Sequence, residues 1–166
     1  MLESLGTNPT QLLGLVAFAS ATIACIFAKR NSPNEGWAWT ALAITNAAFF
    51  VEILFGIRHR LHDVADSLLF SAGLYEGRAD LQYFLIFVSA AVLFFLSLLL
   101  FFLRRARNPG LSIATVASLT ILGLIVLEVI SLHQIDQIFY QKIGPILLVG
   151  WLWCIACVAI VLSTLL

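Results

Sequence analysis

The stretch Gln82–Leu103, QYFLIFVSAAVLFFLSLLLFFL, decides the fold of this chain. A helix needs about 20 mainly apolar residues to cross the roughly 30 Å of hydrocarbon in a bilayer. This stretch reaches that length without a charged residue, and three arginines follow directly as Arg104, Arg105 and Arg107. It therefore predicts a membrane-spanning helix that ends at a charged membrane surface.

Four more stretches have the same character, and only Glu52 and Glu128 interrupt them with a charge. These stretches are residues 10–28, 37–57, 111–132 and 144–166. The alternation of polar and apolar residues that a membrane β-barrel requires is absent from them. The sequence predicts an all-α, polytopic helix bundle of about five transmembrane helices, forming a single membrane domain over residues 1–166. Apolar residues without a proline continue past Arg58, so we expect the second helix to extend beyond the membrane surface.

The composition excludes an ordinary soluble domain. The chain is 61% hydrophobic and 11% charged, against about 45–50% and about 25% in soluble proteins. Nine basic and nine acidic residues give zero net charge, which predicts no nucleic-acid partner. Walker, Rossmann, nucleophile-elbow and H-E-x-x-H patterns are absent, so the sequence leaves open whether the chain is an enzyme.

The loops suggest an orientation. Residues 29–36 and 104–110 hold five cations in a short length, whereas residues 58–81 and 133–143 spread four over a longer one. Cytoplasmic loops carry the excess of lysine and arginine. We therefore expect the N-terminus outside and the C-terminus in the cytoplasm, in a plasma membrane of the bacterial type.

Polar side chains gather at the predicted outer end of the second helix. On one continuous helix with 100° per residue, five of them fall within roughly 100° of one another. These five are Glu52, His59, His62, Asp63 and Asp66. Glu52 lies inside the span, where an ionisable group costs on the order of a few kcal/mol unless it is paired or neutralised. His59, Arg58, a metal ion or a water-filled cavity are candidates for offsetting that cost.

A second polar group lies at the same end, on the fourth helix. Glu128 is about as deep as Glu52, and His133 and Asp136 follow it. Glu128 and His133 point about 140° apart on one rigid helix. A break near Ser131 is needed before both can face one point.

Several interpretations of these residues compete. Imidazole and carboxylate groups suit a transition metal such as Zn, Fe or Cu, and His59 or His62 with His133 offers a weaker case for haem. Alternatively, Glu52 and Glu128 exchange protons with water, or these side chains only pair and fix the packing. The predicted function is thus a small membrane protein with a metal-binding cluster. The alternatives are a non-catalytic subunit of a larger membrane complex, with other subunits or its own copies as partners, and an oligomeric ion or small-solute permease.

Small residues indicate how the helices pack. The first two spans are rich in alanine, which lets their backbones approach closely, and Asn46 is expected to hydrogen-bond across an interface. The phenylalanine-rich span 82–103 is expected to be the most exposed.

The four tryptophans are interpreted as interfacial anchors. They are Trp37, Trp39, Trp151 and Trp153. The three cysteines, Cys25, Cys154 and Cys157, are interpreted as packing residues.

Overall fold

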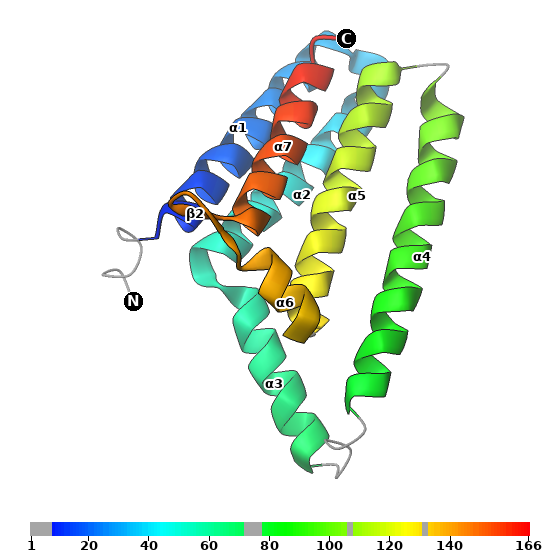
Figure 1. Cartoon of the computed structure of the whole chain (residues 1–166). Coiled ribbons are helices and arrows are strands. Elements are labelled where there is room, and N and C mark those ends of the chain that lie inside the picture. Colours follow the sequence, from blue (N-terminus) through cyan, green and yellow to red (C-terminus); the bar gives the residue numbers. More distant parts are fainter. Residues whose placement is uncertain (1–7, 72–77, 106–107, 131–132) are drawn as a thin grey trace.

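A computed structural model describes residues 8–71, 78–105, 108–130 and 133–166. Within them the chain forms a helix bundle with one short hairpin (Figure 1). The long helices are α1 (Pro9–Asn31), α2 (Gly36–Phe55), α4 (Arg78–Arg105) and α5 (Pro109–Ile130). The shorter elements are a 3-10 turn (Pro33–Glu35), α3 (Ile57–Ser71), α6 (His133–Phe139), β1 (Lys142–Ile143), β2 (Ile146–Leu147) and α7 (Leu148–Ser163). The predicted all-α fold is confirmed.

Among the described residues, four helical segments are long and apolar enough to cross a membrane, namely Pro9–Asn31, Pro33–Phe55, Ala79–Phe102 and Pro109–Ile130. Lipid provides no hydrogen-bond partners, and a helix satisfies its own backbone groups internally. The chain is therefore an integral, multi-pass membrane protein. The two helix-connecting segments with the densest cations lie at one end of the bundle, where the Glu35 carboxylate accepts a hydrogen bond from the Asn108 side chain. Figure 1 shows the C-terminus at this end and α3 and α6 at the other.

The fifth apolar segment differs from the prediction. Residues 144–166 were expected to form one helix opened by Gly144-Pro145, but α7 begins only at Leu148. Gly144 has φ 68°, a left-handed conformation that suits glycine in a turn, and it joins the paired strands β1 and β2. The first residues of the segment belong to the hairpin, so α7 has only 16 residues. Its length is about 24 Å at 1.5 Å per residue.

The core lies between α1, α2, α5 and α7. Phe18 of α1 is fully buried and packs against Phe49 and Trp153, with ring centroids 5.7 and 6.1 Å apart. The expected close packing of α1 with α2 is present, and alanines fill much of this core. Asn46 is fully buried, and its Nδ2 donates to Ser118 Oγ at 3.4 Å, which confirms the expected bond between helices.

Helix α4 stands outside this core. It packs against α5, and none of the residues in its most apolar stretch is buried. Figure 1 shows α4 on the far side of α5 from α1 and α2. The prediction that this span is the most exposed is confirmed.

The anchoring role predicted for the tryptophans is wrong for two of them. Trp39 and Trp153 are only 2% and 1% exposed inside the protein, whereas Trp37 is 70% exposed. A side chain surrounded by other helices cannot sit among lipid headgroups. Trp151, at 38% exposed, still fits an interfacial position.

The contact between α5 and α7 predicts a strong difference between two glycines. A methyl group at Gly110 would collide with the backbone carbonyl oxygen of Ser163, which has no freedom to move away. At Gly123, the nearest obstacle is the flexible end of Leu93, 3.3 Å away. Gly110→Ala should therefore lower the free energy of unfolding by about 1–3 kcal/mol through overpacking.

Thermal denaturation in detergent measures this difference, with Gly123→Ala as the matched control. The control should unfold close to the wild type. Equal melting temperatures for Gly110→Ala and the wild type would show that the two helices do not approach as closely as described.

Candidate functional site: a guanidinium between two buried carboxylates

The site begins with a break in the chain at Gly56. The sequence predicted one continuous helix through this point, but α2 ends at Phe55 and Gly56 has φ 61° and ψ 42°. This left-handed conformation is common directly after a helix and favours glycine. The Gly56 N–H donates to the Glu52 carbonyl oxygen at 2.7 Å, which closes the last turn. The predicted extension of the second helix is thus a separate helix, α3.

The break turns Arg58 back toward the bundle. Its backbone N–H donates to Glu52 Oε1 at 3.2 Å, and its Nη1 donates to Glu52 Oε2 at 3.1 Å. The ion pair is largely buried, because the side chains of Arg58 and Glu52 are 13% and 11% exposed. Two bonds from the first turn of α3 therefore satisfy the carboxylate at the last turn of α2.

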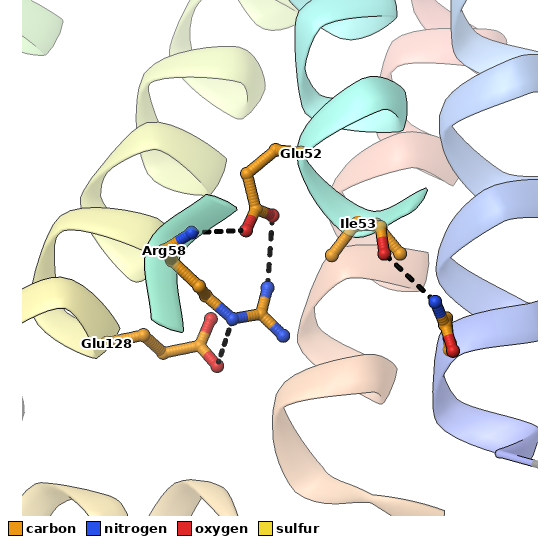
Figure 2. A network of polar contacts seen from close by, with 5 residues as sticks. Glu52, Ile53, Arg58 and Glu128 are labelled. Atoms are coloured by element: carbon orange, nitrogen blue, oxygen red, sulfur yellow. Dashed lines mark hydrogen bonds and ion pairs between the residues drawn. The ribbon is translucent and has the colours of Figure 1, made fainter. Parts of the chain in front are cut away.

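Glu128 of α5 approaches the same guanidinium from the opposite side (Figure 2). Arg58 Nε lies 3.5 Å from Glu128 Oε1, an ion-pair distance that is too long for a good hydrogen bond. The Glu128 side chain is completely buried, and neither of its carboxylate oxygens has a hydrogen-bond partner among the described residues. Arg58 thus binds two carboxylates, one tightly and one loosely.

The ring of Trp153 of α7 packs against the Arg58 guanidinium. The Arg58 guanidinium carbon lies 5.0 Å from the centre of the Trp153 ring, a cation–π contact. We call Glu52, Arg58, Glu128 and Trp153 the charged centre. It joins α2, α3, α5 and α7 at one end of the bundle.

Two residues of the α6 region act on the charged centre from outside. Asp136 lies close enough to interact electrostatically with Glu128. Burial raises the pKa of the Tyr140 hydroxyl, and the nearby Glu128 carboxylate raises it further. The Tyr140 hydroxyl therefore keeps its proton at neutral pH and remains a hydrogen-bond donor.

The predicted cluster is only partly assembled. Glu52 and Glu128 do converge, and Arg58, one of the candidates for offsetting the cost of burying Glu52, lies between them. Because of the break at Gly56, the single face proposed for Glu52, His59, His62, Asp63 and Asp66 does not exist, and Asp63 is exposed. The side chains of His59, His62, Asp66 and His133, and the predicted break near Ser131, lie outside what the structure describes.

Metal ligands do not gather among the described side chains. Where side chains are described, no three His, Cys, Asp or Glu residues come together in a group that would hold a metal ion. The three cysteines are free, with Cys25 and Cys157 buried in the core, as expected for packing residues.

Comparisons with models of protein families, with curated proteins and with solved structures gave no match to this chain.

Proposed function

We propose that this chain is an ion- or solute-handling membrane protein whose working group is the charged centre, which takes up and releases one proton. The observation that carries this proposal is Arg58 shared between two buried carboxylates, Glu52 and Glu128. It corresponds to the permease interpretation of the sequence, with proton exchange as its chemistry.

The charge balance gives the physical reason. Two ionised carboxylates against one guanidinium leave one negative charge uncompensated, and Asp136 adds to it. An uncompensated buried charge is costly, and in proteins the group usually becomes neutral instead. A proton on either glutamate leaves Glu52, Arg58 and Glu128 together without net charge. Glu128 is the better candidate, because its carboxylate accepts no hydrogen bond from the described residues, whereas Glu52 accepts two.

Orientation in the membrane follows from the same cation counts as before. The described residues of segments 29–36 and 104–110 lie at the end opposite the charged centre. If that end is cytoplasmic, as the positive-inside rule favours, the charged centre lies on the outer side, with the N-terminus outside and the C-terminus inside. A plasma membrane of the bacterial type remains part of this proposal.

Proton exchange predicts the behaviour of Glu128→Gln, which keeps the shape of the side chain but removes its titration. In liposomes with an imposed pH gradient and a trapped pH indicator, the wild type should collapse the gradient, and the variant should be at least about tenfold slower. Asp80→Asn, a neutralised carboxylate on the exposed start of α4, is the matched control and should behave like the wild type. Equal rates for all three proteins and for empty liposomes would contradict the proposal.

A metal site remains a prediction from the sequence. Its candidate ligands are Glu52, His59, His62, Asp63, Asp66, Glu128, His133 and Asp136. A cation at Glu52 and Glu128 would have to compete with the guanidinium that already lies between them. Metal analysis of purified wild type and of a His59→Ala/His62→Ala variant separates metal binding from proton exchange without a metal. Stoichiometric Zn, Fe or Cu in the wild type alone would favour the metal site.

A role as a subunit of a larger membrane complex, or as a self-associating chain, is the second candidate. The observation that favours it is α4, whose apolar stretch has no buried residue and whose Phe87, Phe95 and Phe102 are each at least 67% exposed. Co-purification in a fixed stoichiometry with other chains or with its own copies, after extraction in mild detergent, tests this role. A monomer alone would count against it.

A further inference from the structure

A small polar pocket lies beside the charged centre, next to the start of α1. The residues that line it include Thr10, Gln11, Arg58, Tyr140 and Trp153. Its volume is about 210 Å³, below the roughly 300–1,000 Å³ typical of sites for drug-sized ligands. The pocket therefore suits a ligand, or a headgroup, of only a few atoms.

Arg58 has donors left for this pocket. A guanidinium carries five N–H groups; Nη1 donates to Glu52, and Nε faces Glu128 at an ion-pair distance. Figure 2 shows the second terminal nitrogen, Nη2, pointing away from both Glu52 and Glu128. Among the described residues, this nitrogen has no hydrogen bond or ion pair.

Other walls of the pocket also offer donors. Trp153 is 1% exposed, and its indole Nε1, which can only donate, has no acceptor among the described residues. Tyr140 brings a hydroxyl that stays protonated. Meanwhile the Thr10 hydroxyl already accepts from the Leu147 N–H at 2.9 Å, and the Ile53 carbonyl oxygen accepts from Gln11 at 3.1 Å. Arg58 Nη2 and Trp153 Nε1 are therefore two donors without partners among the described residues.

We infer that this pocket binds a small oxyanion, the sulfate-, phosphate- or carboxylate-type group of a solute or a lipid headgroup, through Arg58 Nη2 together with Tyr140. Arg58 is one partner for both the pocket and the carboxylates, so binding is coupled to the proton of the charged centre. The coupling rests on the proposed function, whereas the pocket itself does not.

The sign of the coupling follows from the charges that surround Arg58. Glu52 of α2, Glu128 of α5 and Asp136 of α6 are acidic, Tyr140 is neutral, and α1 and α7 contribute uncharged Thr10, Gln11 and Trp153. An oxyanion adds a negative charge beside these acids. Protonation of one carboxylate removes part of that repulsion, so the oxyanion should bind more tightly as the pH falls.

Calorimetric titration with sulfate tests the inference, because the charge of sulfate is the same at mildly acidic and at alkaline pH. The full chain is placed in nanodiscs of phosphatidylcholine. The wild type should bind sulfate on the order of tenfold more tightly at acidic pH. Tyr140→Phe should weaken binding by about fivefold, the loss of one hydrogen bond. Tyr83→Phe, on the half-exposed start of α4, is the matched control and should bind like the wild type.

A second arm separates a solute from a lipid source. Nanodiscs with phosphatidylglycerol should weaken sulfate binding if a lipid headgroup enters the pocket, and leave it unchanged if the ligand is a solute. Absence of sulfate binding at either pH in phosphatidylcholine would overturn the inference that this pocket binds an oxyanion. Equal affinity in Tyr140→Phe and wild type would overturn it too. Binding that depends on Tyr140 but not on pH would support oxyanion binding in the pocket. It would overturn the proposal that the charged centre exchanges a proton.

Discussion

Replacing Arg58 with alanine should lower the free energy of unfolding by about 3–5 kcal/mol, because it leaves two carboxylates buried without a cation. Glu128 is completely buried and Glu52 nearly so. Adding Glu52→Gln and Glu128→Gln to Arg58→Ala should recover part of the loss, since no buried charge then remains. Thermal or denaturant unfolding in detergent measures both effects.

Arg30→Ala is the matched control for Arg58→Ala. Arg30 is exposed and stacks over Phe27 at 5.5 Å, a contact worth about 0.5–1 kcal/mol at an exposed site. The two arginines thus differ in burial and in their carboxylate partners. A similar small effect for both would contradict the buried ion pairs.

Truncation of Trp153 to alanine should have the second large effect, a loss of about 3–5 kcal/mol, as for other buried aromatic residues. The ring is 1% exposed, packs against Phe18, and lies under the Arg58 guanidinium. Its edge also fits against Gly14 of α1, where a methyl group would stand 3.3 Å from the ring. The same detergent unfolding assay measures this loss.

Trp151 provides the comparison two residues away on the same helix. It is 38% exposed, and its indole nitrogen donates to the Ile143 carbonyl oxygen at 3.2 Å. Trp151→Ala should cost about 1 kcal/mol, mainly that hydrogen bond. If Trp151→Ala and Trp153→Ala lower the free energy of unfolding equally, Trp153 does not pack against the Arg58 guanidinium as described.

The membrane helices were predictable from the sequence because their signal depends on composition over long stretches. Any uncharged run such as 82–103 must cross a bilayer or be buried, whatever its neighbours are. That Glu52 and Glu128 lie at the same end of the bundle was also predictable, since both are near the ends of their spans and far along the chain from the cation-rich loops. Both inferences need only the position of a residue along its helix. They do not depend on how the chain changes direction at the end of that helix.

The arrangement of the site was not predictable because it depends on two glycines. Gly56 interrupts a run with no proline, and apolar residues continue on both sides, so helical periodicity gave no warning. The one available signal was a glycine two residues before the charged sequence Arg58-His59-Arg60, a position typical of a helix end. Gly144-Pro145 was likewise compatible with a helix start, yet it forms the turn of a hairpin.

The burial of Trp153 needed information from another helix. A tryptophan near the end of an apolar segment is typical of an interfacial anchor. Here the absence of a side chain at Gly14 of α1 makes room for the ring, and the break at Gly56 brings Arg58 over it. Neither cause lies on the helix that carries the tryptophan.

The central claim is that one carboxylate bound to Arg58 holds an exchangeable proton. Infrared difference spectra of the purified protein, recorded between acidic and alkaline pH, measure it directly. The wild type should show the carbonyl band of a buried carboxylic acid that disappears as the pH rises, and Glu128→Gln should lack that band while Asp80→Asn keeps it. A band that is absent from the wild type, or unchanged in Glu128→Gln, would contradict the claim.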